Sequence, residues 1–167
     1  MRKTKGEGAK ASAVQASGSC VCGAVRLEID VPARWAWHDH SERSRRAKGC
    51  AYATYVGSYK SRFRWLEGEA HVTRFEDEAE RTVRSFCARC GTPLAYERAT
   101  SPTMINIPRA VFRERTGRET RYHMNLDQQA DWTWTGEKLS PLKGYPGVMW
   151  EPPRRTRRKA LDPMFDL

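Results

Sequence analysis

Two short cysteine pairs constrain the fold of this chain more than any other feature. The first pair is Cys20-Val-Cys22, the second is Cys87-Ala-Arg-Cys90, and a glycine follows each pair. Two thiolate pairs at these spacings can complete a tetrahedral zinc site, and glycine suits the tight turn that each pair needs. The pairs lie farther apart than those of a single zinc finger. We therefore predict one structural Zn²⁺ that joins distant strands and is held by these four cysteines.

Length and composition predict a single-domain protein that is located in a reducing compartment. The 167-residue chain has no apolar run of the roughly 20 residues that a membrane-spanning helix needs. Its basic start lacks the apolar segment of a signal peptide. We therefore expect a cytoplasmic protein without a membrane partner, where reduced thiols favour zinc over the alternative of disulfides. The fifth cysteine, Cys50, lies in an apolar run and is expected to be a buried free thiol.

The formal net charge of +10 is unevenly distributed. Residues 1–17 and 151–167 are basic and poor in core-forming side chains, so we predict two flexible tails around a domain at residues 18–150. Basic charge is only weak evidence for nucleic-acid binding, and no nucleic-acid motif accompanies it. We expect any such binding to be weak and non-specific. The sequence leaves the oligomeric state open.

The apolar pattern predicts a mainly β fold. Val25, Leu27, Ile29 and Val31 alternate with polar residues, as in a half-buried strand that starts directly after the first cysteine pair. Glycine-rich and proline-rich turns separate further short apolar runs. These predicted strands are residues 51–56, 63–66, 70–75, 82–86, 94–97, 104–107 and 132–135. A short helix is predicted only at residues 108–115, so the fold class is small antiparallel sheets with one short helix.

Three motifs in order resemble those of the glutathione-dependent formaldehyde-activating enzyme and centromere protein V family. They are Gly18-Ser-Cys-Val-Cys-Gly-Ala-Val25, Ser44-Arg-Arg-Ala-Lys-Gly49 and Phe86-Cys-Ala-Arg-Cys-Gly-Thr-Pro-Leu94. The resemblance covers roughly residues 18–110. It implies a zinc-stapled β fold of the Mss type, with the same four cysteines as structural ligands. It also implies a carbon–sulfur lyase that acts on a thiol adduct.

The chain departs from this family at a second cysteine cluster, Cys-His-Cys-x-x-Cys, which the resemblance implies is the catalytic zinc site. Asp39, Ser41 and Ser44 take the places of the three cysteines, and His40 keeps the histidine. A serine hydroxyl is a far weaker zinc ligand than a thiolate. We therefore do not expect activity on glutathione and formaldehyde. On a strand, His38 and His40 could converge on a harder metal while Asp39 points away.

Two hypotheses remain for the polar segment at residues 38–48. In an enzyme of altered chemistry, His38 or His40 is the general acid or base, and the segment binds an unknown thiol adduct or small anionic substrate. Its predicted substrate-binding residues are Asp39, Ser41, Ser44, Arg45 and Arg46. In the alternative, the segment is a solvated loop of a catalytically silent binding module. His71 and His123 are predicted to be separate, hydrogen-bonded structural histidines.

Overall fold

The computed structural model of the protein describes residues 14–133 and 139–152. These residues form mainly β-strands. The strands are β1 (Gln15–Ser19), β2 (Arg26–Asp30), β3 (Trp35–Asp39), β4 (Ala53–Tyr59), β5 (Phe63–Glu67), β6 (Val72–Asp77), β7 (Thr82–Cys87), β8 (Pro93–Arg98), β9 (Met104–Pro108), β10 (Tyr122–Met124), β11 (Ser140–Pro141) and β12 (Val148–Trp150). The helical elements are α1 (Glu42–Lys48) and the 3-10 turns η1 (Lys60–Arg62), η2 (Glu69–His71), η3 (Arg109–Val111) and η4 (Leu126–Gln128). None of these helices has the length and apolar character needed to cross a bilayer.

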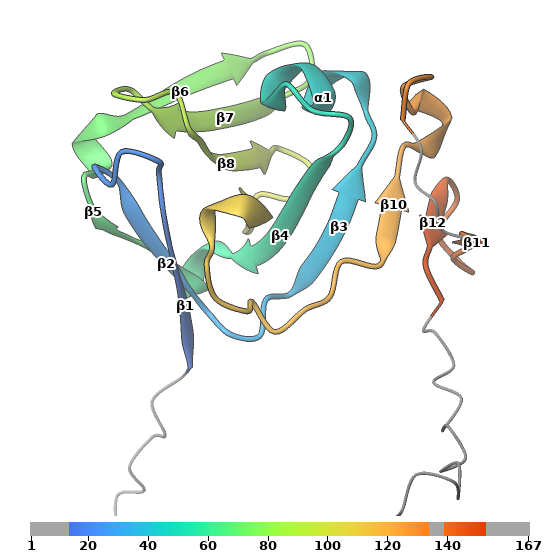
Figure 1. The fold of residues 1–167 in the computed structure, drawn as a ribbon, viewed down its shortest axis with the longest axis horizontal. Coiled ribbons are helices and arrows are strands. Elements are labelled where there is room, and N and C mark those ends of the chain that lie inside the picture. The colour runs from blue at the N-terminus through green and yellow to red at the C-terminus, as the bar shows by residue number, and fades with distance from the viewer. Residues whose placement is uncertain (1–13, 134–138, 153–167) are drawn as a thin grey trace, which may run out of the picture.

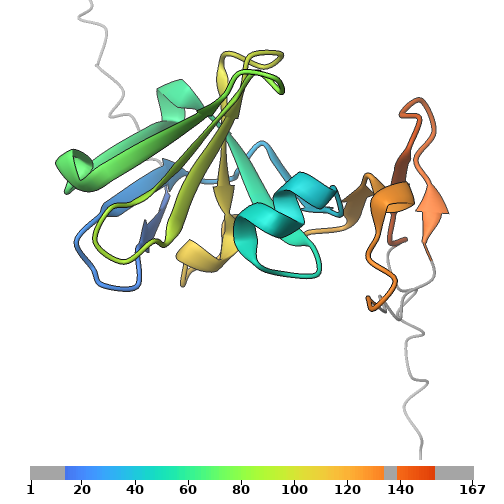
Figure 2. The same ribbon diagram turned by 90° about the horizontal axis from the view of Figure 1, so that it is seen from above.

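The strands build one small and one large sheet. The small sheet has the order β1-β2-β5, and the nine-stranded sheet has the order β11-β12-β10-β3-β4-β9-β8-β7-β6. Neighbouring strands are antiparallel, except that β10 pairs with β3 in parallel. Figure 1 shows the small sheet beside one half of the large sheet, with β10, β11 and β12 at the opposite side. Figure 2 shows α1 beside the middle of the large sheet.

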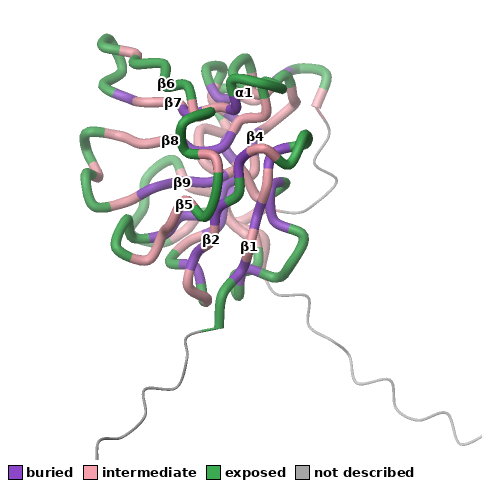
Figure 3. Tube along the Cα trace, turned by 90° about the vertical axis from the view of Figure 1, so that its left-hand side faces the viewer, coloured by how far each residue is buried: buried purple, intermediate pink, exposed green. Residues whose placement is uncertain are grey.

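The main core lies between the small sheet and the large one. Leu27 and Ile29 of β2 pack there in one cluster with Val56 of β4, Leu94 of β8 and Ile107 of β9, all fully buried. Figure 3 shows these buried stretches on β2, β4 and β9. Burial of each such side chain stabilises the fold by roughly 1.5–3 kcal/mol. The predicted alternation in β2 is therefore confirmed. The buried side chains of β2 pack against those of the large sheet.

Most predicted strands are confirmed, but the structure corrects the pattern in three places. The strand predicted at residues 132–135 is wrong for Trp132 and Thr133, which lie outside any strand, and its remainder falls outside the described residues. The strands β3, β10, β11 and β12 were not predicted. Strand β1 begins at Gln15, inside the predicted tail, and its small residues fit a tight space. A Cβ on Gly18, for example, would lie 3.0 Å from the carbonyl oxygen of Val111.

The helix prediction was wrong in position. Within residues 108–115, Pro108 ends β9 and Arg109–Val111 form the turn η3, after which Phe112 is extended and bridges Gly18 of β1. The α-helix is instead α1, inside the polar segment at residues 38–48. The Ser41 side chain accepts a hydrogen bond from the amide of Ser44 at its start, and Gly49, with φ of 62°, ends it. A serine N-cap and a left-handed glycine are common helix boundaries, so the signal was present in the sequence.

Candidate metal centre and neighbouring cavities

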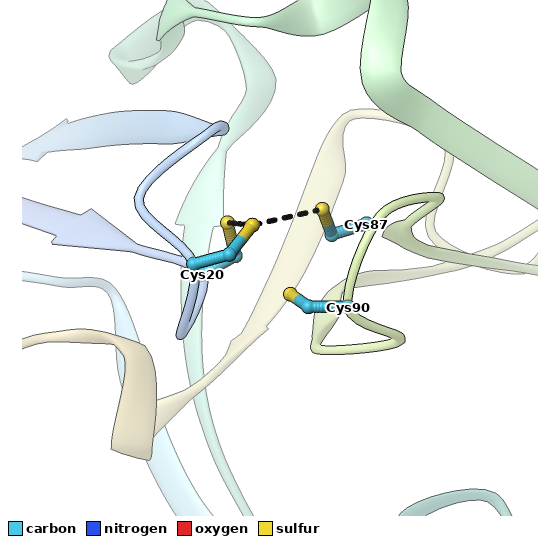
Figure 4. A group of neighbouring side chains, drawn as sticks. Cys20, Cys87 and Cys90 are labelled. Atoms are coloured by element: carbon cyan, nitrogen blue, oxygen red, sulfur yellow. Dashed lines mark hydrogen bonds between the residues drawn. The ribbon is translucent and has the colours of Figure 1, made fainter.

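The four cysteines of the two predicted pairs meet at one point. Their sulfur atoms all lie within 4.8 Å of one another, which fits a single metal ion. The Cys20 and Cys22 sulfurs are 3.5 Å apart and those of Cys22 and Cys87 are 3.9 Å apart. A tetrahedral zinc with sulfur ligands at about 2.3 Å needs sulfur–sulfur separations of roughly 3.8 Å. Figure 4 shows Cys20 facing Cys87 and Cys90 from the opposite turn. The geometry confirms the predicted grouping of the cysteines.

Two matching turns present these sulfurs. The first connects β1 to β2 and the second connects β7 to β8. In the first, Gly23 has φ of 76° and its amide donates to the carbonyl of Cys20 at 3.0 Å; in the second, Gly91 has φ of 73° and its amide donates to that of Cys87 at 2.8 Å. A side chain would strain this left-handed backbone, which explains the glycine after each pair. We call these two turns the first and second knuckles.

Thr92 connects the two knuckles and supports the thiolate form of Cys90. The backbone amide of Val21 donates to the Thr92 hydroxyl oxygen at 3.1 Å, and that oxygen lies 3.1 Å from the Cys90 sulfur. Hydrogen bonds from the Thr92 hydroxyl and then from its amide lower the pKa of Cys90 to about 5. Because zinc binds thiolates, the residues at this site fit Zn²⁺. Four thiolates would leave no open coordination position on a bound zinc, which is typical of structural sites.

The three positions at which the family resemblance implies a second cysteine cluster form a hydrogen-bonded helix cap. The Ser44 hydroxyl donates to Asp39 Oδ2 at 2.7 Å, and the Ser41 amide donates to Asp39 Oδ1 at 3.0 Å. The Asn125 side-chain amide donates to the same Oδ1 at 2.8 Å. Asp39 and Ser44 are both buried. Their polar atoms thus hold the start of α1 against the turn that precedes η4.

Three histidines, His38, His40 and His123, lie close together where β3 pairs with β10. His40 Nε2 lies 2.9 Å from His123 Nδ1, and the rings of His38 and His123 have their centroids 4.8 Å apart. His38 Nδ1 is also 3.0 Å from the Thr54 hydroxyl. Burial, followed by the charge of His123, lowers the pKa values of both His38 and His40 to about 4. His38 and His40 are therefore neutral at pH 7, and burial lowers the pKa of His123 as well.

The histidine cluster does not reach the geometry of a metal site. Among the described residues, only the four cysteines form a group of three or more potential ligands with atoms close enough for one ion. His123 is hydrogen-bonded, as predicted for it, but its partner His40 was not foreseen. The parallel register of β10 and β3, which pairs His123 with His38, brings the cluster together.

The two predicted arginines of α1 lie in different surroundings. Arg45 donates from Nε to the carbonyl of His40 at 3.2 Å and from Nη2 to that of Gln128 at 3.1 Å. Arg45 therefore connects α1 to the residue that follows β3 and to η4. Arg46 is largely exposed, and its Nη1 lies 3.5 Å from a carboxylate oxygen of Glu42 on the same helix. Of the two, only Arg46 lines a cavity.

Two cavities adjoin α1 and the second knuckle. The first, here called the α1 cavity, has a volume of about 760 Å³ and lies between α1 and the strands β6 and β7. The second, here called the knuckle cavity, has about 700 Å³ and includes Cys20 and Cys22 in its wall. Lys48, at the end of α1, lines both cavities. The charged residues of the α1 cavity are Glu42, Arg43, Arg46, Lys48, Asp77 and Arg84.

Two cations of the α1 cavity are not matched by carboxylates. Arg43 pairs with Asp77 at 2.5 Å and with Glu80 at 3.1 Å. Lys48 and Arg84 form no ion pair within the described part of the chain. Arg84 instead lies over the Tyr96 ring at 4.4 Å. The cavity therefore carries an excess of positive charge.

Sequence reasoning missed Lys48 and Arg84 as functional candidates. Lys48 lies in the motif at residues 44–49, next to the arginines that were chosen. Because residues 42–48 form a helix and not a strand, the Lys48 side chain lies over Tyr55 of β4 in the large sheet. Arg84 stands on a strand far away in sequence and carries no local signal. Only the tertiary structure, in which α1 and β7 line the same cavity, shows that the two belong together.

The fold and the four-cysteine site define a small, mainly β protein with a candidate metal centre, and the comparisons with known proteins agree. A family model described as glutathione-dependent formaldehyde-activating enzyme matches residues 15–128. The chain therefore belongs to this family, as its three motifs suggested. A crystal structure of a Rhodobacter sphaeroides protein has the same fold. The TM-score is 0.51 and the identity 23%, and the match covers 59% of this chain and 89% of that chain.

Proposed function

We propose that the protein binds a small anionic thiol adduct in the α1 cavity and acts on it as an enzyme of the carbon–sulfur lyase class. Family membership supports the reaction class. The observation that carries the substrate class is the pair of unmatched cations, Lys48 and Arg84, in one cavity. Its volume of about 760 Å³ lies within the roughly 300–1,000 Å³ of small-molecule sites.

The electrostatics of this pair favour an anion. Lys48 is half-buried, and burial followed by the charge of Arg84 lowers its pKa to about 7. Two like charges that repel in a partly desolvated site are stabilised when a carboxylate or phosphate binds between them. Arg84 can also present two parallel N–H donors to a carboxylate. Arg46 at the mouth of the cavity adds further positive charge.

The zinc in this proposal is part of the scaffold. Cys20, Cys22, Cys87 and Cys90 would hold it, and its role is to fix the two knuckles relative to each other. Gly91 of the second knuckle lines the α1 cavity. The chain's own residues bind and orient the substrate. A role of His38 and His40 as general acid or base stays a prediction, because the wall of the α1 cavity contains neither histidine.

Binding can be tested by nuclear magnetic resonance titration of the zinc-loaded protein with phosphate, glutathione and mercaptoacetate. We expect shifts at α1 and β7 that are lost in Lys48→Gln and Arg84→Gln. Lys60→Gln is the matched control, because it removes the same charge from a lysine that is paired with Glu97. Turnover is then measured as free-thiol release from glyoxylate adducts of the thiols that bind. Equal binding in all four proteins would contradict the proposed site.

A specific observation also favours the alternative, a catalytically silent binding module. Asp39, Ser41 and Ser44 are engaged in capping α1, so the positions of the second cysteine cluster offer no free ligand for a metal. The same titration separates the two functions. Binding that depends on Lys48 and Arg84 without release of thiol from any bound adduct would leave the binding module as the function.

A further inference from the structure

Lys48 is placed to do chemistry as well as to bind charge. We propose that its side-chain amine is a nucleophile that condenses with the carbonyl group of a small acid, such as a 2-oxo acid or an aldehyde acid. This inference rests on the anion site proposed above, which would hold the acidic group.

The Lys48 amine forms no ion pair with a carboxylate among the described residues. Its Nζ lies over the ring of Tyr55, 5.5 Å from the centroid. Arg84 of β7 also contacts Tyr55, because its Nη1 donates to the Tyr55 hydroxyl at 3.4 Å. The thiol of Cys50 lines the knuckle cavity together with Lys48, and it donates its proton to the carbonyl of Tyr52 at 3.1 Å. No described carboxylate competes with a substrate for this amine.

This environment supports a neutral amine near pH 7. Burial and then the neighbouring Arg84 lower the pKa of Lys48 to about 7, which favours the free base far more than in an ordinary lysine. An ordinary lysine with a pKa near 10.4 is almost fully protonated at that pH. A desolvated lysine beside another cation is a known means of activating an amine toward carbonyl compounds. The cavity position gives this amine access to a substrate.

The reaction balances without an oxidant or a metal. The nitrogen lone pair of Lys48 attacks the carbonyl carbon, and the carbonyl oxygen takes up a proton to give a carbinolamine. Loss of that oxygen as water forms the carbon–nitrogen double bond of an imine. The protonated imine is a stronger electrophile than the parent carbonyl, so a thiolate can add to its carbon and form a carbon–sulfur bond while the C=N electron pair moves to nitrogen. Protonation and departure of the Lys48 amine break the carbon–nitrogen bond, and addition of water with loss of a proton releases the hemithioacetal and regenerates Lys48. Such a step needs no second zinc site.

Imine formation can be tested by reductive trapping on the full-length, zinc-loaded protein. The protein is incubated at pH 7 with glyoxylate and cyanoborohydride, and the modified residue is found by peptide mass mapping. We expect Lys48 to be modified about tenfold faster than Lys60 or Lys143, which are exposed or ion-paired. In Lys48→Arg this adduct should vanish, while Lys60→Arg should leave it unchanged. Zinc content and melting temperature check that both variants are folded.

The same experiment separates failure of this inference from failure of the proposed function. Modification spread evenly over all lysines, or absent from Lys48, would overturn the inference even if phosphate binds at α1 and β7. Glycolaldehyde, a neutral probe, tests the anion site. If glyoxylate is trapped on Lys48 faster than glycolaldehyde, and Arg84→Gln removes this difference, both proposals are supported. Equal trapping of both probes at Lys48, with no effect of Arg84→Gln, would support the amine and overturn the anion site.

Discussion

The sulfur of Cys22 lies 3.9 Å from that of Cys87, although 65 positions separate the two residues. Cys22 belongs to the knuckle of the small sheet, and Cys87 ends β7 of the large sheet. A metal ion bound there cross-links the two sheets that enclose the main core. Because the long intervening chain must be ordered before these sulfurs can meet, metal binding and folding are coupled.

The first prediction concerns this cross-link. Cys87→Ser should leave the chain insoluble or largely unfolded, because the hydroxyl is a poor zinc ligand and binding energy of structural zinc is folding energy. Cys50→Ser is the matched control, since Cys50 is a free cysteine outside the cluster, and it should cost no more than about 1 kcal/mol. Zinc content by mass spectrometry should be one ion per chain in the wild type and in Cys50→Ser. Normal melting of Cys87→Ser would contradict the structural role.

The second prediction concerns the cap of α1. Ser44→Ala removes the donor to Asp39 Oδ2 and leaves a buried carboxylate with an unmet acceptor, so the free energy of unfolding should fall by about 1–3 kcal/mol. Ser58→Ala is the control, because this buried hydroxyl donates only to the adjacent carbonyl of Tyr59 at 3.3 Å. Urea unfolding measures both. Equal losses of unfolding free energy in the two variants would show that the cap of α1 contributes no more to stability than the Ser58 hydroxyl does.

The third prediction concerns acid. Burial holds the pKa of fully buried His40 at about 4, below the 6.5 of the unfolded chain. Between pH 6.5 and 4 the unfolded chain therefore binds more protons, and the free energy of unfolding falls as the pH falls. Between pH 6.5 and 4.5, His40 should lower the free energy of unfolding by about 2 kcal/mol. Above pH 6.5 it should have little effect.

His40→Asn isolates the histidine part of this acid sensitivity. Acid also protonates the cysteines and releases zinc, so a zinc-binding dye should follow each unfolding series. The variant should keep the zinc-dependent loss and show a flatter slope between pH 6.5 and 4.5. Identical slopes in wild type and variant would mean that His40 does not titrate in this window.

The fourth prediction concerns the reaction for which the family is named. The protein should not measurably accelerate formation of the formaldehyde adduct of glutathione. Its four-cysteine site has no open position, and Asp39, Ser41 and Ser44 are committed to the helix cap. The measurement is the rate of adduct formation with and without zinc-loaded protein. Turnover at ordinary enzyme rates would show that three cysteines at these positions are unnecessary.

Local patterns determined much of this protein. The alternation around Leu27 and Ile29 is a property of neighbouring residues, and it correctly predicted β2. The two cysteine pairs and their glycines likewise carry the geometry of each knuckle within a few residues. Short-range preferences were less reliable where packing opposes them. The segment at residues 108–115 has helix-like boundaries, yet Phe112 gains a bridge to Gly18 of β1 and stays extended.

Only the tertiary structure decided which distant residues share a site. The parallel pairing of β10 with β3 places His123 beside His38, and the packing of α1 on the large sheet places Lys48 near Arg84. Neither pairing leaves a periodic or local signal. The sequence by itself therefore determined the fold class and the grouping of the four cysteines, because these depend on spacing and alternation. The unmatched charge of the α1 cavity arises when separate strands and a helix are brought together, and that arrangement is fixed by long-range packing.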